Sequence, residues 1–230
     1  MASGLAQKDP LIGRWVGDHL FRQAVLKFPK PLGERALYIF LPPLPDRPFH
    51  VQLQGMLQET WYSPLHATVW LDGNPGGQYV LYYCFGISKA TAGGRVVLTN
   101  ASEPSGHPLS NYYVVNDRSA EDLRTLAAMS DFLKRVAGII DAEVVRTEEN
   151  VAGGALHEFG GLRMGRNPAD SVTSPTGRFW RIPNLSCADS ATWPSQGSAN
   201  SYLTITAVAL RNASHLADAL TGSNSLDEGA

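Results

Sequence analysis

The sequence predicts an α+β fold in which helices cover an antiparallel sheet. Short runs of β-branched and aromatic residues alternate with turn clusters in the first hundred residues. One capped helical pattern follows, and a glycine-rich segment then leads into a last helix. Strands that follow one another over short loops are expected to pair antiparallel.

The strands are expected in five runs, at residues 36–41, 49–57, 66–71, 78–85 and 95–99. Clusters of proline, glycine, aspartate and asparagine separate these runs, as at 42–43, 72–77 and 93–94. Such residues favour turns because proline fixes φ and glycine allows positive φ. A further short strand is expected at 143–146.

The helical pattern begins after Ser119, whose hydroxyl can cap the first turn. Glu121 and Asp122 suit the positive end of the helix dipole, and apolar residues then recur at helical spacing to about Gly138. This helix is expected to cover one face of the sheet. A last helix is expected over 201–220, followed by a flexible tail at 223–230.

The composition argues against several classes of function. The chain has 230 residues and a formal net charge of -2, which offers no basic surface for nucleic acid or an anionic membrane. No stretch reaches the roughly 20 apolar residues of a membrane span, and a cytoplasmic location is expected. The scattered histidines show no metal-ligand spacing, so no metal is expected. Cys84 and Cys187 are expected to be free thiols.

Three segments resemble the C-terminal signature of the glucose-methanol-choline (GMC) family of flavin oxidoreductases. Residues 13–19 read GRWVGDH, which is similar to the family's GRNLxDH, with Trp15 in place of asparagine. Residues 157–165 read HEFGGLRMG, close to HEMGGxRMG. The third segment starts at Gly177 and ends in NSYLTI at 200–205, close to NPTLTI, with Ser201 and Tyr202 in place of proline and threonine. Order, spacing and identity together are specific.

This resemblance implies a division of the chain. Residues 1–20 would end a flavin-binding α/β domain, 21–150 would form the substrate-binding domain, and 151–222 would form the C-terminal strand and helix portion that contacts flavin. The family's GxGxxG turn, which holds the FAD pyrophosphate at a helix N-terminus, has no match here. The FAD-binding half is therefore expected from a separate subunit or from a missing N-terminal half.

The resemblance also implies catalytic and cofactor-binding roles. His157 would be the base that takes the hydroxyl proton as hydride leaves the same carbon for FAD, and Asn200 would orient that hydroxyl. A loop histidine and a simple helix N-cap are the structural alternatives for these two residues. Non-covalent contacts to flavin would come from Asp189, Ser190, Ser201, Tyr202 and Thr204. Asp189 could instead be a solvated turn residue, and His50, His66, His107 and His215 are expected to be ordinary surface or core residues.

Three functions fit these observations. The first is a partial GMC-type enzyme that oxidises the CH–OH group of an alcohol or sugar once the flavin-binding half is supplied. The second is a catalytically idle binding or interaction module, or a truncated fragment, that keeps the fold. The third is a lyase that uses the same flavin site without hydride transfer.

Overall fold

A computed structural model describes residues 4–33, 37–55, 78–98, 112–149, 155 and 157–222. Its largest sheet has five antiparallel strands in the order β3-β4-β5-β2-β9. These strands are β2 (Leu20–Lys27), β3 (Leu37–Leu41), β4 (Phe49–Gly55), β5 (Tyr79–Gly86) and β9 (Glu143–Glu149). The α+β class and the antiparallel sheet are thus confirmed.

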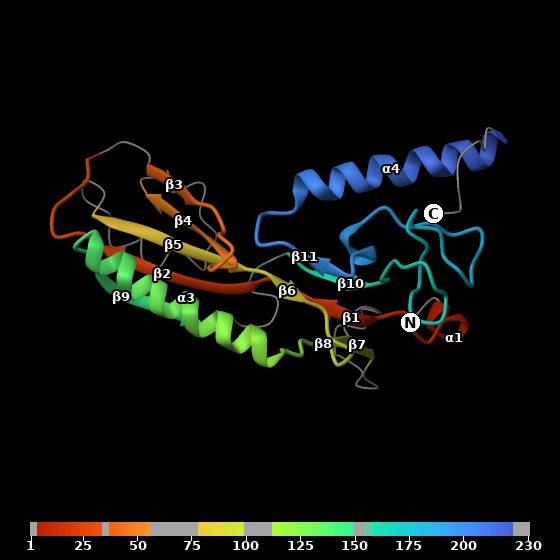
Figure 1. Cartoon of the computed structure of the whole chain (residues 1–230), viewed down its shortest axis with the longest axis horizontal. Coiled ribbons are helices and arrows are strands. Elements are labelled where there is room, and N and C mark those ends of the chain that lie inside the picture. The colour runs from red at the N-terminus through yellow and green to blue at the C-terminus, as the bar shows by residue number, and fades with distance from the viewer. Residues whose placement is uncertain are drawn as a thin grey trace, which may run out of the picture.

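Helix α3 (Ala120–Ile139) lies along one face of this sheet (Figure 1). Ser119 caps it through a reciprocal pair of hydrogen bonds with Asp122, so the predicted start is confirmed. Its apolar stripe packs onto alternate residues of the sheet, and together they form the main core. That core contains Leu20, Ala24, Leu26, Phe49, Val51, Leu53, Val80, Tyr82, Cys84, Leu126, Met129, Leu133, Val136 and Ala137.

A second lobe holds two small sheets and the last helix (Figure 1). A four-stranded sheet has the order β10-β1-β7-β8, and β11 pairs with β6. These elements are β1 (Arg14–Gly17), β6 (Ser88–Lys89), β7 (Arg95–Leu98), β8 (Tyr112–Val115), β10 (Phe159–Gly161) and β11 (Ser195–Gln196). Two short helices, α1 (Leu5–Lys8) and the 3-10 turn η2 (Ser190–Thr192), belong to the same lobe.

Helix α4 (Tyr202–Thr221) confirms the predicted last helix, and it lies on the outside of the molecule (Figure 1). Asn212 is its one buried residue, and its amide donates to the Cys187 carbonyl at 3.1 Å. Gly177 permits this contact, because a side chain there would collide with Asn212 and with the Cys187 carbonyl. The helix is therefore fixed to the lobe along a narrow line, and large apolar side chains elsewhere on it are exposed.

The strand predictions differ in part from the structure. Strand β2, which lies between β5 and β9, was not predicted, because Arg22 and Gln23 interrupt the apolar and polar alternation of LFRQAVLK. The strand expected within the C-terminal portion, for which the apolar run 185–188 before Asp189 was the candidate, does not form there: these residues make one isolated bridge, from Arg178 to Ser186, and Asp189 then caps η2. The run at 66–71, His66, His107 and the tail at 223–230 lie outside the described residues.

Candidate active site

Antiparallel pairing brings two of the signature segments together. In the pair of β1 with β10, Gly17 lies opposite Phe159, so the residues that follow β1 lie beside those that precede β10. His19 and His157 consequently meet edge to face, with ring centroids 5.0 Å apart. Gly160 is required for this approach, because its φ is +82° and a side chain there would collide with the Trp15 carbonyl.

Asp18 fixes the backbone that carries His157. Its buried carboxylate accepts hydrogen bonds from three backbone N–H groups, those of His19 at 2.7 Å, His157 at 3.2 Å and Ala155 at 3.3 Å. Burial raises the pKa of Asp18 above its usual value, although the three N–H donors oppose this effect. The aspartate of the first signature segment thus holds the histidine of the second.

His157 itself is half-buried and suited to accept a proton. Burial lowers its pKa below the usual 6.5, while nearby Glu158 opposes the shift, so the ring is neutral at pH 7. Its Nδ1 is buried and makes no hydrogen bond to the described residues. The other nitrogen, Nε2, is the atom left to meet a ligand.

Two further histidines join His157 around the ring of Phe85. His50 stacks on Phe85 with ring centroids 5.0 Å apart, His157 lies 5.5 Å from it and His19 lies 5.7 Å from it. We call His19, His50 and His157 the histidine cluster. The pKa of both His19 and His50 is lowered to about 4, chiefly by burial, and the positive charge that His157 gains on protonation contributes to this shift.

Sequence reasoning missed His50 as a site residue. It is buried, and the expectation of a surface or core residue allowed for this. It packs against Phe85 with the other two histidines, however, and is not part of the main core. The available signal was the alternation in β4, where apolar Phe49, Val51 and Leu53 face α3 and polar side chains occupy the intervening positions. His215 is exposed on α4, as the surface alternative predicted.

Asn200 is connected to the same group of residues. Its Oδ1 accepts a hydrogen bond from Gln52 Nε2 at 2.9 Å, and this same Nε2 lies 2.8 Å from His50 Nε2. Asn200 is not the N-cap of α4, because Ser201 occupies that position and makes no side-chain capping bond. The simple N-cap alternative for Asn200 is therefore wrong.

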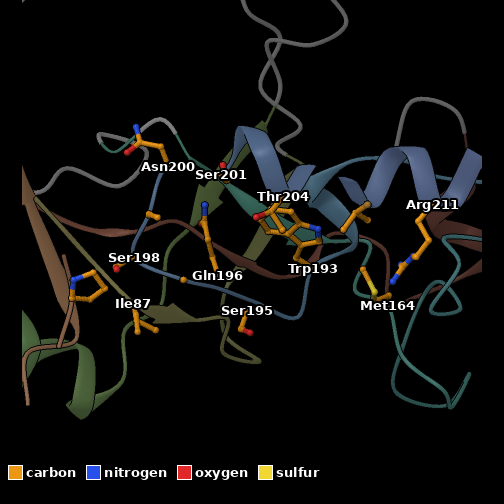
Figure 2. A pocket seen from close by; sticks show the side chains of 14 residues that line it. Ile87, Met164, Trp193, Ser195, Gln196, Ser198, Asn200, Ser201, Thr204 and Arg211 are labelled. Atoms are coloured by element: carbon orange, nitrogen blue, oxygen red, sulfur yellow. The ribbon is translucent and has the colours of Figure 1, made fainter. Parts of the chain in front are cut away.

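A cavity of about 580 Å³ lies at the N-terminus of α4 (Figure 2). Its walls come from residues between 193 and 201, from the first turns of α4, and from single residues of three other segments. The lining residues are Pro43, Ile87, Met164, Trp193, Ser195, Gln196, Gly197, Ser198, Ala199, Asn200, Ser201, Thr204, Val208 and Arg211. The helix N-terminus contributes a partial positive charge and free backbone N–H groups to this space.

Gln196 is a buried residue of this wall whose amide has no partner. The residue is 4% exposed, and neither its Nε2 nor its Oε1 makes a hydrogen bond in the described structure. Figure 2 shows its side chain pointing toward Ser201 and the start of α4. A buried amide left without partners is unfavourable, so this position fits a ligand that offers both a donor and an acceptor.

The predicted flavin-contact residues separate into two groups. Ser201 and Thr204 line the cavity with Asn200, whereas Tyr202 is 80% exposed and does not line it. Asp189 and Ser190 act within the protein: Asp189 Oδ1 caps η2, and the Ser190 hydroxyl donates to the Glu158 carbonyl at 3.1 Å. The roles in flavin binding stay predictions.

Trp15, which replaces the family's asparagine, has a structural function here. The Arg163 guanidinium lies over its ring at 4.1 Å from the centroid. Trp15 also adopts a positive φ of 55°, which is rare for a bulky residue. The pair joins the first signature segment to the second.

A match to a family model shows which protein family the chain belongs to. Residues 90–209, just over half of the chain, match the model described as GMC oxidoreductase. The chain belongs to the GMC oxidoreductase family. The resemblance carried by the three signature segments is thereby confirmed, and membership of this family implies an FAD cofactor.

Curated GMC relatives are considerably longer than this chain. Paromamine 6'-oxidase of Streptomyces fradiae is 36% identical over 126 residues, which cover 54% of this chain and 23% of that protein. C-glycoside 3-oxidase of Microbacterium trichothecenolyticum is 28% identical over 195 residues, which cover 83% of this chain and 36% of that protein. The aligned part of the chain thus spans about a quarter to a third of each relative.

Solved structures of similar fold are likewise covered only in part by this chain. Pyridoxine 4-oxidase from Mesorbium loti has a TM-score of 0.50 at 18% identity, covering 90% of this chain and 43% of that one. Formate oxidase from Aspergillus oryzae RIB40 has a TM-score of 0.61 at 13% identity, covering 89% and 47%. At such identities the likeness concerns the fold alone.

Other site types receive no support from the described part of the chain. Its His, Cys, Asp and Glu side chains form no group that could hold a metal ion. Its helices include none with the length and apolar character needed to cross a membrane. Both cysteines are free thiols, as predicted.

Proposed function

We propose that this chain is the substrate-binding and catalytic part of an enzyme that oxidises the CH–OH group of an alcohol or sugar by hydride transfer to non-covalently bound FAD. The observation that carries the proposal is the neutral, half-buried His157 beside the network that holds Asn200. The relatives named as oxidases of paromamine and of C-glycosides support a sugar-like alcohol as substrate. The two free thiols support a cytoplasmic location.

His157 is the proposed base. Removing hydride from a CH–OH carbon requires that the hydroxyl proton leave as well, and a neutral imidazole accepts it at pH 7. His19 and His50 keep the cluster neutral because their own pKa values lie near 4. Asn200 holds the reacting oxygen from the side of the cavity.

The residues that line the cavity fit a flavin ring edge. Ser201 and Thr204 offer hydroxyl groups, and the unpartnered Gln196 amide offers one donor and one acceptor group at a buried position. The α4 N-terminus favours negative charge nearby, which is what a reduced flavin carries. When bound, FAD would supply the hydride acceptor.

The exposed side of α4 is the proposed contact for the FAD-binding half. Leu203, Leu210 and Leu220 are 83%, 68% and 79% exposed on this helix, which is unusual for large apolar side chains. The longer relatives contain sequence beyond the aligned part, which supports a partner domain of this family. Such a domain would cover these leucines and supply the pyrophosphate site.

The test supplies that half by co-expression or fusion, using the corresponding N-terminal portion of C-glycoside 3-oxidase. Flavin reduction by a panel of sugars and simple alcohols is then followed by stopped-flow absorbance. At least one of these substrates is expected to reduce the flavin. His157→Ala should slow this step by about 10²- to 10⁴-fold, the usual cost of losing a general base.

Imidazole rescue separates a lost base from a damaged site. Added imidazole should restore part of the rate of His157→Ala, because it can occupy the space that the substitution leaves. It should not restore the rate of Asn200→Ala, because that variant has lost a hydrogen bond to the substrate but still has its proton acceptor, His157. Flavin that binds but is reduced by no member of the panel would instead support an idle binding module.

A further inference from the structure

Strand β4 directs three polar side chains toward the face of the sheet opposite α3. His50, Gln52 and Gln54 alternate along this strand with the apolar residues of the main core. They form one connected chain of hydrogen bonds: Gln54 Nε2 donates to Gln52 Oε1 at 2.8 Å, and Gln52 Nε2 contacts both His50 and Asn200. Gln52 is 4% exposed, so water does not replace these partners.

The donor direction of this chain follows from its partners. An amide nitrogen only donates, so a Gln52 Nε2 placed between His50 and Asn200 requires an acceptor at each of them. His50 Nε2 must then carry no proton, and the single proton of the neutral ring lies on Nδ1. The backbone of Ser198 stabilises a proton on the His50 ring, and this effect is consistent with a proton on Nδ1. Nδ1 itself makes no hydrogen bond of ordinary geometry in the described structure.

We propose that Gln52 is a positioning residue that fixes the Asn200 amide with its Oδ1 toward Gln52 and its NH2 group free for a ligand. Because Gln52 occupies the Asn200 Oδ1, the Nδ2 donors are the part of this side chain left for a ligand. The inference rests on the proposed function, in which Asn200 contacts the reacting oxygen. The site therefore offers that oxygen a hydrogen-bond donor and not an acceptor.

This polarity has a chemical consequence. As the hydroxyl proton moves to His157, negative charge grows on the substrate oxygen, and a fixed donor stabilises that charge more than it stabilises the neutral alcohol. A reversed Asn200 would present its carbonyl oxygen and repel the same charge. Gln52 thus links the tautomer of His50 to the orientation of Asn200.

The first experiment measures the His50 tautomer by long-range ¹H–¹⁵N NMR of this chain at pH 7, with the ring assigned by its loss in His50→Gln. The expected spectrum shows a proton on Nδ1 and a bare Nε2. A proton on Nε2 would mean that Gln52 accepts there and that Asn200 presents its oxygen, and this outcome would overturn the proposal.

The second experiment reverses the network with Gln52→Glu. A carboxylate accepts where Gln52 donated, so Asn200 should turn and donate its NH2 to residue 52. Its Nδ2 protons, assigned by their loss in Asn200→Ala, should exchange with water at least about 10-fold more slowly than in the unmodified chain. An unchanged exchange rate contradicts the proposal. If Gln52→Glu does not fold, Gln52→Met should instead release Asn200 and alter its Nδ2 shifts.

Gln78→Met is the matched control, because Gln78 also donates a hydrogen bond, to the Phe28 carbonyl, but directly precedes β5, at the end away from Phe85. It should leave the His50 tautomer and the Asn200 amide unchanged. With the FAD-binding half supplied, Gln52→Glu should slow flavin reduction about 10²-fold, near the lower cost of losing one such donor. Correct NMR results with no reduction by any substrate would refute the proposed function and leave the Gln52 inference standing.

Discussion

Asp18 and His157 are 139 positions apart in the sequence, yet the Asp18 carboxylate accepts the His157 backbone N–H at 3.2 Å. The same carboxylate binds the N–H groups of His19 and Ala155. One buried side chain therefore determines where the proposed base lies relative to the end of β1. This arrangement explains why an acid immediately precedes His19 in the first signature segment.

Removing that carboxylate should destabilise the chain. Asp18→Ala leaves three backbone N–H groups without an acceptor, two of them buried, and should lower the free energy of unfolding by about 3 kcal/mol or more. Asp18→Asn keeps one acceptor oxygen and should lose less. Urea denaturation measures both variants. Asp131→Ala, at an exposed aspartate on α3, should change the free energy by under about 0.5 kcal/mol. An equally small effect of Asp18→Ala would contradict the assigned role.

The histidine cluster should make the fold acid-sensitive. His19 and His50 have pKa values near 4 in the folded chain and about 6.5 when unfolded, so between these pH values the unfolded chain binds more protons. Their stabilising contribution is present above pH 6.5 and is lost as the pH falls toward 4, by about 3 kcal/mol for each ring. Urea titrations at successive pH values measure this slope.

Two variants test the origin of that slope. His50→Gln should make it about half as steep, because one of the two strongly shifted rings is gone. His215→Gln alters an exposed histidine on α4 and should leave the slope as it is. A His50→Gln chain that loses stability with acid as steeply as the unmodified chain would show that carboxylates, and not the cluster, cause the acid sensitivity.

Gln196→Leu should act in opposite directions on folding and on flavin binding. The free chain should become as stable or about 1 kcal/mol more stable, because the substitution removes a buried amide that has no partner. With the FAD-binding half supplied, the flavin dissociation constant should rise about 10-fold through the lost hydrogen bonds. Thermal unfolding and flavin fluorescence titration provide the two readings.

The comparison variant is Gln78→Leu, since Gln78 donates to the Phe28 carbonyl and so has a partner within the fold. This variant should lose about 1 kcal/mol of stability and leave flavin affinity unchanged. If Gln196→Leu behaves in the same way, the Gln196 amide serves the fold and the flavin assignment is wrong.

The sequence by itself determined the family, the α+β class, the capped helix α3 and the last helix α4. Each of these depends on local information: a signature of fixed spacing, a turn cluster, or a cap within three residues of its partner, as Ser119 is of Asp122. It also singled out His157 and Asn200, because both stand in signature segments. Their catalytic roles stay predictions.

Only the tertiary structure decided what surrounds those two residues. Gln52 and Asn200 are 148 positions apart, and they meet because the register of β4 turns Gln52 to the face of the sheet opposite α3. A shift of one residue would have turned Gln52 into the core. Likewise, Gln196 reads in the sequence as an ordinary polar residue, and its significance appears only when burial leaves its amide without a partner beside α4. Register and burial are properties of the packed chain, so local patterns could not supply them.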